Sequence, residues 1–457
     1  MNRLFISAAH KSSGKTTLCL GLAAALRARG ETVQPFKKGP DYIDPLWLGL
    51  AAGRPCYNLD PYLSGAEELR AEFAQRMHGA TLGLVEGNKG LYDGLALDGS
   101  NSNAALATML GTPVVLVIDA RGMTRGIAPL ILGFQAFDPN IRIAGVILNQ
   151  LGGARHEAKL RAVIAHYTGV PVLGAVQYDE QLAIVERHLG LVPSNEAEGA
   201  RARVEAIAAR IAAQVDLEAL LAVARSAESL DAPAALKPQR TGEPSLRLGI
   251  ARDSAFGFYY PGDLEALRAA GAELVPFDAL RDKRLPAVDA LFIGGGFPET
   301  HMDALAANAE MRGAVRDAIE AGMPAYAECG GLMYLARSIQ WHGRRAEMAG
   351  VLPADIVMHA RPVGRGYVHL RETGRGPWPA RATAVIRAHE FHYSSVENLA
   401  PGLEFAYEVE RGHGIDGRHD GIVYRNLLAS YCHLRDVAEH PWARRFVEFA
   451  ATAATHA

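Results

Sequence analysis

The chain has 457 residues, of which 49% are hydrophobic and 21% are charged, and its formal net charge is −3. This balance is typical of a globular protein with two or three domains. Because the net charge is small, no electrostatic attraction to nucleic acid or to an anionic membrane is expected, and we predict neither as a partner.

The cysteines and the N-terminus indicate the compartment. The four cysteines are too scattered for a disulfide framework, and they form no CxxC metal motif. The opening residues, MNRLFIS, predict a strand rather than a signal peptide, and no apolar stretch is long enough to span a membrane. A reducing cytoplasm is therefore the expected location.

Apolar strand patterns alternate with helical patterns in the first half of the chain. The expected strands are 4–8, 32–36, 82–86, 114–119, 143–148 and 172–176. The expected helices are 16–29, 66–77, 103–110, 126–137, 157–168 and 201–224. This alternation predicts an α/β fold of the P-loop NTPase type, with a parallel sheet covered on both faces. Ligands of such sheets bind at the carboxyl ends of the strands.

The first expected strand leads into a phosphate-binding motif. The run AHKSSGKTT connects it to a helical pattern, in the order strand, small-residue loop, Gly-Lys-Thr and helix. Loop amides and the helix N-terminus can hold phosphate oxygens, while Lys15 reaches the β and γ phosphates and Thr16 binds Mg²⁺. Ala9 replaces the first glycine of the usual motif, and a chance Gly-Lys-Thr is the alternative. The candidate nucleotide-binding residues are Ser13, Gly14, Lys15, Thr16 and Thr17.

Carboxylates follow two further strands at the same edge of the expected sheet. Glu86 ends one strand, and Asp41 and Asp44 follow another. Oxygen ligands there suit Mg²⁺ bound to phosphates, so Thr16, Asp41 and Glu86 are the candidate metal ligands. Asp residues beside Gly and Pro also form turns, which is a strong alternative for Asp44 and Asp93.

Four further polar residues near this edge each have two possible interpretations. Lys37, with its neighbour Lys38, either neutralises a phosphate or substrate carboxylate or forms a solvated surface pair. Asp119 and Asn149 also follow strands, and each is interpreted equally well as a nucleotide contact or as a cap or turn residue.

Residues 226–245 separate the two halves of the chain. The segment holds three prolines and few large apolar residues, which is typical of a linker. We therefore predict domains at 1–225 and 246–457. The second half has expected strands at 246–251, 274–277, 290–294 and 324–327, and expected helices at 261–270, 304–321 and 331–338. This pattern predicts a second α/β domain.

One cysteine in the second half has the setting of a nucleophile elbow. In the run YAECGGLMY, an apolar segment ends at Cys329, two glycines follow and a helical pattern begins. The glycines permit a sharp turn, and a helix N-terminus behind the sulfur favours the reactive thiolate. A buried cysteine beside a Gly-Gly turn is the alternative, which the spacing disfavours.

The sequence also offers an oxyanion hole and a base for this cysteine. The run FIGGGFPE follows an expected strand, and the amides of Gly295 and Gly296 are placed to converge on one oxygen. The histidine settings for the base are HEFH at 389–392 and YCH at 431–433, where His433 follows an apolar run. A Cys–His pair permits thiolate attack on a carbonyl and proton delivery to leaving ammonia.

These motifs resemble two enzyme families joined in one chain. Cys329 in ECGG, the upstream GGGFPE and the late Tyr-x-His resemble a class I glutamine amidotransferase domain, and the P-loop half resembles dethiobiotin synthetase. The fusion of the two, with KKGPDYIDP, VEGNKGLYDG and HEFHYS, is similar to the cobyrinate a,c-diamide synthase family over essentially the whole chain.

The resemblance implies a carbon–nitrogen ligase. It would use ATP, Mg²⁺ and L-glutamine to amidate the a and c acetate side chains of a tetrapyrrole polycarboxylate through an acyl phosphate. A homodimer is one assembly to be considered. The implied roles are nucleophile for Cys329, base for His433, and metal binding or activation for Thr16, Asp41 or Asp44, and Glu86.

One departure from the amidotransferase pattern concerns the base. Ordinary triad amidotransferases carry a glutamate two residues after the catalytic histidine, and this chain has Arg435 there. The cobyrinate-type branch lacks that glutamate, so a Cys–His dyad is still implied. Asp436 is then a candidate to orient His433.

A second departure concerns the acceptor. The usual KVGPDYIDP and VEGVMGLYDG are here KKGPDYIDP and VEGNKGLYDG, so Lys38 and Lys89 line the expected acceptor site, together with Asp44 and Asp93. The extra lysines leave a siroheme or sirohydrochlorin amide synthase of the same family as an alternative. Cobyric acid synthase, a P-loop regulatory ATPase and a non-catalytic tetrapyrrole carrier are less favoured.

Overall fold

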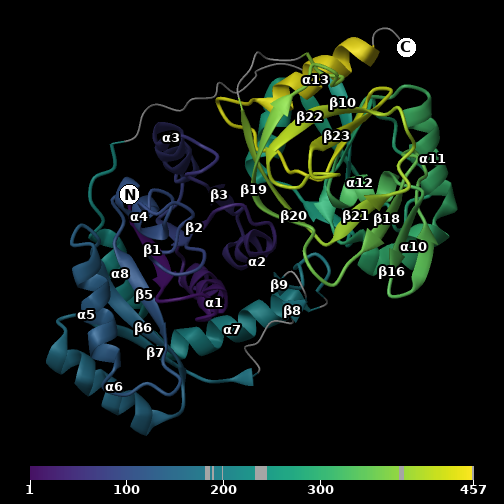
Figure 1. The fold of residues 1–457 in the computed structure, drawn as a ribbon. Coiled ribbons are helices and arrows are strands. Elements are labelled where there is room, and N and C mark those ends of the chain that lie inside the picture. Colours follow the sequence, from purple (N-terminus) through teal and green to yellow (C-terminus); the bar gives the residue numbers. More distant parts are fainter. Residues whose placement is uncertain (181–185, 188–189, 198, 232–243, 380–384, 455–457) are drawn as a thin grey trace. The chain divides into compact units, whose positions relative to one another are not determined.

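The computed structural model describes residues 1–180, 186–187, 190–197, 199–231, 244–379 and 385–454. The chain forms two compact units, residues 1–237 and 238–457 (Figure 1). Because 232–243 lies outside the described residues, the predicted linker at 226–245 and the predicted domain bounds stay predictions.

The N-terminal unit is built on a seven-stranded sheet in the order β3-β2-β4-β1-β5-β6-β7, and all its pairs are parallel. Its strands are β1 (Arg3–Ala8), β2 (Val33–Lys38), β3 (Tyr57–Leu59), β4 (Leu82–Glu86), β5 (Val114–Asp119), β6 (Ile143–Leu151) and β7 (Val172–Gln177). The predicted parallel sheet is confirmed. A short pair, β8 (Glu186–Arg187) and β9 (Gly190–Leu191), lies outside it.

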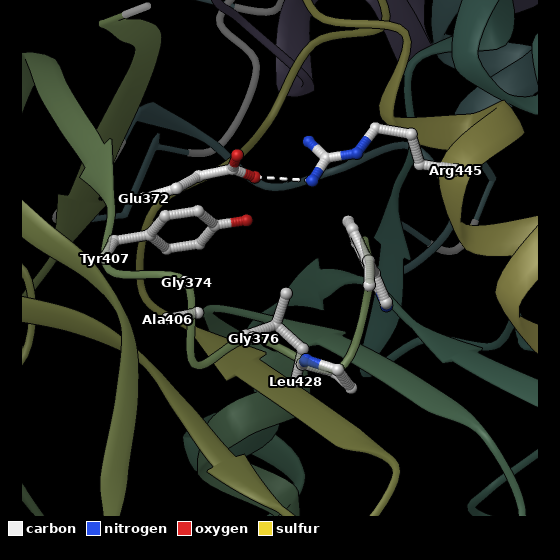
Figure 2. A pocket seen from close by; sticks show the side chains of 9 residues that line it. Glu372, Gly374, Gly376, Ala406, Tyr407, Leu428 and Arg445 are labelled. Carbon is white, nitrogen blue, oxygen red and sulfur yellow. Dashed lines mark hydrogen bonds and ion pairs between the residues drawn. The ribbon is translucent and has the colours of Figure 1, made fainter. Parts of the chain in front are cut away.

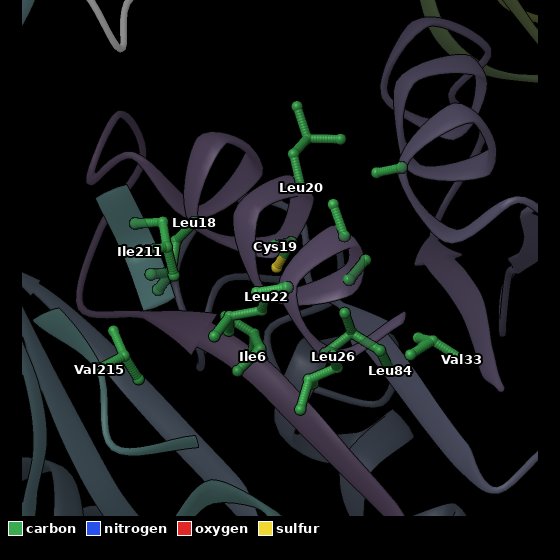
Figure 3. Packing of buried hydrophobic residues seen from close by; sticks show 14 of the residues in the cluster. Ile6, Leu18, Cys19, Leu20, Leu22, Leu26, Val33, Leu84, Ile211 and Val215 are labelled. Carbon is green, nitrogen blue, oxygen red and sulfur yellow. The ribbon is translucent and has the colours of Figure 1, made fainter. Parts of the chain in front are cut away.

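Helices cover both faces of this sheet, as predicted. They are α1 (Lys15–Ala28), α2 (Ile43–Ala52), α3 (Ala66–Arg76), α4 (Asn103–Met109), α5 (Ile127–Phe137), α6 (Ala154–Tyr167), α7 (Ala200–Gln214) and α8 (Leu217–Arg225). Alternate residues of β1 enter opposite cores: Ile6 packs with α1, α2, α7 and α8, and Phe5 packs with α3 to α6. Figure 3 shows the first core, where Leu18 of α1 lies beside Ile211 of α7.

One predicted helix in this unit is wrong in detail, and helix α2 was missed. The expected helix 201–224 is two helices, because Val215 has extended backbone and the Asp216 side chain accepts a hydrogen bond from the Ala219 amide to begin α8. Helix α2 was not predicted, since its sequence holds Pro45. A proline is tolerated there because the first-turn amides of a helix have no partner within the helix.

The C-terminal unit has a nine-stranded mixed sheet in the order β12-β10-β13-β15-β24-β23-β22-β19-β20. Pairs from β12 to β24 are parallel and the rest are antiparallel. Its strands are β10 (Leu246–Ala251), β12 (Ala272–Phe277), β13 (Ala290–Ile293), β15 (Ala325–Glu328), β19 (Gly364–Glu372), β20 (Ile386–His392), β22 (Glu404–Arg411), β23 (His419–Tyr424) and β24 (Leu427–Ser430). The four predicted strands are confirmed, and the antiparallel half was not predicted.

Smaller elements complete this unit. The helices are α9 (Pro261–Ala270), a 3-10 turn η2 (Pro298–His301), α10 (Met302–Ala307), α11 (Ala309–Glu320), α12 (Gly330–Leu335) and α13 (Trp442–Ala454). The short sheets use β11 (Phe256–Phe258) with β14 (Gly295–Gly296), and β16 (Ser338–Trp341), β17 (Arg344–Glu347), β18 (Asp355–Met358) and β21 (Ser394–Glu397).

The expected helix 304–321 is also interrupted, at Asn308. The Asn308 side chain donates hydrogen bonds to the main-chain oxygens of Ala279 and Asp282, both at 2.9 Å, and these bonds hold its backbone out of helical geometry. Across the described residues of both units, no helix has the length and apolar character needed to cross a membrane.

Candidate functional sites

The phosphate-binding motif forms the loop between β1 and α1. Gly14 stands at the N-cap of α1 with φ of +80°, and a Cβ there would lie 2.3 Å from Asn149 Nδ2. Glycine is therefore required for both conformation and space. Asn149 Nδ2 donates to the main-chain oxygen of Ser13 at 2.9 Å, which ties the loop to the end of β6. The free amides at the start of α1 make this loop suited to an anion.

Lys15 reaches from this loop to the segment after β4. Its Nζ donates to the main-chain oxygen of Lys89 at 2.6 Å. Burial lowers the pKa of Lys15, and the carboxylate of Glu86 counteracts part of that effect. The P-loop and the VEGNKGLYDG segment are thus in direct contact.

The predicted acidic residues gather around one lysine. Lys37 Nζ lies 2.5 Å from Asp44 Oδ2, 2.8 Å from Glu86 Oε1 and 3.8 Å from Asp41 Oδ2. Thr16 Oγ1 donates to Glu86 Oε1 at 2.7 Å and to Asp44 Oδ2 at 3.3 Å. Parallel pairing of β2 with β4 brings these side chains together, although they are far apart in sequence.

The charges in this cluster shift one another's pKa. Burial acts to lower the pKa of Lys37, but Asp44 and Glu86 outweigh it and raise that pKa well above the usual value. Burial, with the nearby Asp44 carboxylate, raises the pKa of Asp41 to about 7. Burial also raises the pKa of Glu86. The cluster therefore holds a permanent cation among carboxylates, one of which titrates near neutral pH.

The other candidate acceptor residues have unequal exposure. Lys38 is buried, and its Nζ donates to the main-chain oxygen of Asn101 at 2.6 Å. Asp93 Oδ2 accepts a hydrogen bond from the Gly90 amide at 2.8 Å, which is the turn geometry considered as its alternative. Lys89 is exposed. Of the two lysines, Lys89 is the one that solvent-borne substrate can reach directly.

A cavity of about 270 Å³ opens beside Gly14 and Thr17, at the carboxyl ends of β6 and β7. The rest of its lining is Leu18, Asn149, Gln150, Val176, Gln177, Tyr178, Asp179, Glu180 and Ile211. Sequence reasoning found only Asn149 among these, because the others lie in β6, in helices or at and after the end of β7, without a motif. The other uncertain residue, Asp119, instead pairs with Arg121 at 2.6 Å.

Cys329 occupies a strained turn between β15 and α12. Its φ is +46° and its ψ is −101°, a conformation that a non-glycine residue rarely adopts. The Cys329 amide donates to the main-chain oxygen of Ser430 at 2.7 Å, which holds the turn against β24. A Cβ on Gly331 would lie 2.0 Å from the main-chain oxygen of Ile293, so this glycine is required by close approach of the backbone.

The predicted oxyanion residues lie next to this turn. A Cβ on Gly330 would lie 2.9 Å from the Gly296 amide nitrogen, which places that nitrogen at the start of α12. A Cβ on Gly295 would lie 2.7 Å from His433 Cε1. Gly295 and Gly296 therefore border both Cys329 and His433, and their role as oxyanion donors remains a prediction.

His433 follows β24 and is buried beside Cys329. Burial alone lowers its pKa, but hydrogen bonds with Cys329 and with Glu328 outweigh burial and raise the pKa of His433 to about 10. The His389 ring stacks on it, with ring centroids 4.9 Å apart, and burial holds the pKa of His389 well below its usual value. His433, one of the two predicted histidine settings, is hydrogen-bonded to Cys329.

Comparison with known proteins agrees with this arrangement. The profile of the CobQ/CobB/MinD/ParA nucleotide binding domain matches residues 5–192, and that of the CobB/CobQ-like glutamine amidotransferase domain matches residues 247–438. The cobyrinate a,c-diamide synthase of Magnetococcus marinus is 49% identical over 98% of this chain and 97% of its own. That of Methanosarcina acetivorans is 41% identical over 98% of this chain and 95% of its own. The chain belongs to the cobyrinate a,c-diamide synthase family.

Structural similarity adds little to this assignment. PurLQS from Thermotoga maritima superposes with a TM-score of 0.35 and 15% identity over 47% of this chain and 99% of its own. The family membership confirms the resemblance found from the motifs, and the relatives named above do not favour the siroheme amide synthase alternative.

In this member of the cobyrinate a,c-diamide synthase family, Arg435 does not stand in for the missing glutamate. Its guanidinium forms an ion pair with Asp263 of α9 and lies over the Tyr260 ring at 4.8 Å. Asp436 Oδ2 accepts a hydrogen bond from the Ala443 amide at the start of α13.

The carboxylate bonded to His433 is that of Glu328, with Oε2 3.3 Å from Nδ1. Sequence reasoning did not select Glu328 and considered Asp436 instead. A signal was present, since Glu328 is an acidic residue at the end of an otherwise apolar, buried strand.

A further pocket in the C-terminal unit is too small for a substrate. It is bordered by Glu372, Tyr407 and Arg445, and the Glu372–Arg445 ion pair of 2.5 Å closes one side (Figure 2). Its volume of about 10 Å³ corresponds to one water molecule at most. None of its lining residues belongs to the Cys329–His433 site.

Proposed function

We propose that this protein transfers the amide nitrogen of glutamine to the a and c acetate side chains of cobyrinate, with hydrolysis of ATP. The observation that carries the proposal is the strained Cys329, hydrogen-bonded to His433, in a chain that also has a P-loop and is 49% identical to a cobyrinate a,c-diamide synthase. The two compact units then perform the two halves of the reaction.

The C-terminal unit releases ammonia. His433 holds the proton of Cys329, and the thiolate attacks the amide carbon of glutamine to form a C–S bond. The amides of Gly295 and Gly296 hold the resulting oxyanion. His433 then gives the proton to the nitrogen as the C–N bond breaks, ammonia leaves, and water hydrolyses the thioester to glutamate.

The N-terminal unit activates the acceptor. An acetate oxygen of the substrate attacks the γ phosphorus of ATP, ADP leaves, and an acyl phosphate remains. Ammonia attacks that carbonyl and phosphate leaves, which forms the amide. Lys15 and the first amides of α1 hold the phosphates during the transfer, and the cavity beside Gly14 and Thr17 has room for the nucleoside.

The oxygen atoms near Thr16 fit a magnesium ion. Glu86 is fully buried, and its Oε2 has no hydrogen-bond partner within the part of the chain that the structure describes. The described residues contain no complete cage of three acidic, histidine or cysteine side chains. Mg²⁺ does not need one, because it binds through one or two carboxylates, phosphates and water. Thr16, Glu86 and Asp41 would hold the ion, which neutralises charge on the phosphates when bound.

The metal proposal has a test that does not depend on turnover. Glu86→Gln should remove the Mg²⁺ dependence of ADP affinity while leaving metal-free ADP binding in place, as measured by calorimetry. Equal Mg²⁺ dependence in the variant and the wild type would contradict this ligand set.

The acceptor site is proposed at the exposed surface around Lys89. Its ammonium can pair with a substrate carboxylate, whereas buried Lys38 holds the loop through Asn101. Asp44 and Asp93 lie on the neighbouring segments and complete the candidate acceptor residues.

Mass spectrometry tests the function as a whole. The protein is incubated with Mg-ATP, glutamine and either cobyrinate or sirohydrochlorin, and each amidation replaces a hydroxyl by an amino group. Two amidations of cobyrinate are expected. Preferred amidation of sirohydrochlorin would overturn the acceptor assignment, and absence of amidation of both would overturn the proposed activity.

A further inference from the structure

We infer that Glu328 is the positioning residue for His433: it holds the ring through Nδ1 and leaves Nε2 to exchange a proton with Cys329. This inference rests on the proposed glutamine chemistry. It assigns to the residue immediately before the nucleophile a task that ordinary triad amidotransferases give to a glutamate two residues after the histidine.

The carboxylate of Glu328 is held at one oxygen and offers the other to His433. Oε1 accepts hydrogen bonds from the Tyr326 hydroxyl at 2.6 Å and from the Leu434 amide at 3.0 Å. Oε2 lies 3.3 Å from His433 Nδ1. Because Leu434 follows His433 in the chain, Glu328 fixes both the backbone next to the histidine and the ring itself.

Burial strengthens the contact between Glu328 and His433. Glu328 and His433 are each 3% exposed, so water cannot replace either partner. A hydrogen bond between an imidazole and a carboxylate is stronger in such surroundings than at the surface. An apolar or displaced side chain at 328 would leave Nδ1 without its orienting partner, whereas a neutral amide there would keep an acceptor and lose the charge that stabilises the imidazolium.

The groups facing His433 come from three elements. Glu328 comes from the end of β15, Cys329 from the turn after it, and His389 from β20. His389 is kept neutral by burial, so it adds no positive charge at neutral pH. Arg435, the next charged side chain along the chain, is paired with Asp263. The negative groups therefore dominate and stabilise the imidazolium.

The proton path follows from this geometry. The proton moves from Cys329 Sγ to His433 Nε2, which leaves a thiolate and an imidazolium. The Glu328 carboxylate accepts the Nδ1 hydrogen bond and stabilises the imidazolium. The proton later leaves with ammonia, and Glu328 takes no part in the covalent steps.

The decisive variant is Glu328→Gln, which preserves shape and removes charge. Glutamine hydrolysis should fall about 10- to 100-fold in kcat with little change in KM, less than the roughly 10⁴-fold loss seen when a serine triad loses its orienting carboxylate. The loss is smaller because a thiol ionises more readily than a hydroxyl. The basic limb of the pH–rate profile should move to lower pH, since His433 loses its stabilising anion.

Three other variants separate positioning from structure. Glu328→Asp keeps the charge, so the basic limb of its pH–rate profile should lie between those of Glu328→Gln and the wild type. Tyr326→Phe removes one donor to Glu328 and should shift the profile in the same direction by less. Glu390→Gln is the matched control, because Glu390 is also a buried carboxylate and accepts hydrogen bonds from the His413 and Gly414 amides. Its pH profile should match the wild type.

Several outcomes would overturn the inference. The first is a Glu328→Gln variant whose kcat and whose basic limb of the pH–rate profile match the wild type. The second is an equal loss of kcat in Glu328→Gln and Glu390→Gln while both pH–rate profiles stay unchanged. Thermal unfolding shows whether Glu328→Gln folds. If it does not fold, a wild-type pH–rate profile in Tyr326→Phe overturns the inference. Absence of glutamine hydrolysis in the wild type, or full hydrolysis in Cys329→Ala, would instead overturn the proposed function.

Discussion

Lys15 Nζ donates a hydrogen bond to the main-chain oxygen of Lys89 at 2.6 Å. The P-loop lysine is thus held by the segment that carries the exposed lysine of the proposed acceptor site. In the proposed mechanism a nucleotide phosphate would compete with the Lys89 oxygen for the Lys15 ammonium, so we expect nucleotide binding to affect the position of the proposed acceptor segment.

Lys15→Met should abolish amidation with glutamine and with ammonia alike. A loss of about 10²- to 10³-fold is expected, which is the scale for removing one preorganised donor to developing charge. The measurement is ADP release in the presence of acceptor and each nitrogen source. Lys11→Met is the matched control, since Lys11 lies exposed on the same loop and should retain activity. Ammonia-dependent activity at the wild-type level in Lys15→Met would rule out the phosphate role.

Cys329→Ala should separate the two halves of the reaction. Glutamine-dependent amidation should fall by roughly 10⁴-fold or more, the scale for losing a covalent nucleophile. Amidation with ammonium salts should persist, because the proposed activation of the acceptor by ATP takes place in the N-terminal unit. Cys432→Ala serves as the control, since Cys432 is a fully buried thiol in the same unit and should keep both activities. Loss of both activities in Cys329→Ala would contradict two separate sites.

His389 should make the C-terminal unit less stable in acid. Its folded-state pKa lies below the usual 6.5, so the unfolded chain binds more protons at acidic pH. The stability that neutral His389 contributes is present above pH 6.5 and is lost as the pH falls below it, by up to about 1.4 kcal/mol per pH unit. His389→Phe keeps a ring against His433 and should remove this part of the acid sensitivity.

The test for His389 is urea unfolding at pH 7.5 and pH 5.5. The wild type should lose more stability between these values than His389→Phe. His359→Gln is the control, since His359 is exposed and its loss should leave the acid sensitivity unchanged. Equal acid sensitivity in His389→Phe and the wild type would show that folding does not lower the pKa of His389.

Lys89→Ala should weaken acceptor binding without affecting glutamine hydrolysis. An exposed ion pair contributes about 0.2–1 kcal/mol, so the acceptor KM should rise by roughly 1.4- to 5-fold. Salt screens such a pair, and the difference from wild type should shrink as ionic strength increases. Lys159→Ala, at an exposed position of α6, is the control and should keep the wild-type KM. An unchanged KM in Lys89→Ala at low salt would move the acceptor site elsewhere.

Local motifs were predictable because their chemistry is contiguous in the chain. The loop before Lys15 needs small residues and a following helix, and both stand next to it in sequence. Cys329 likewise has its strand, its turn and its glycines within a few residues. The six predicted strands of the N-terminal sheet were visible because strands of a buried parallel sheet are nearly continuous apolar runs.

Elements of weaker pattern were not predictable. The antiparallel strands from β19 to β23 contain fewer apolar residues and are partly exposed, so their sequences resemble those of loops. Helix α2 was missed because Pro45 suggests a turn, although a first-turn proline costs a helix no hydrogen bond. Asn308 divides a helical pattern through bonds to a distant segment, which no local periodicity shows.

The sequence alone determined that a P-loop and a cysteine elbow occur, because each depends on neighbouring residues. Only the tertiary structure decided which distant side chains contact these two motifs. Lys37 meets Glu86 because β2 pairs with β4, and Glu328 meets His433 because β15 pairs with β24. These contacts join residues far apart in the chain, so strand pairing, rather than local propensity, selects which charged groups share a buried site.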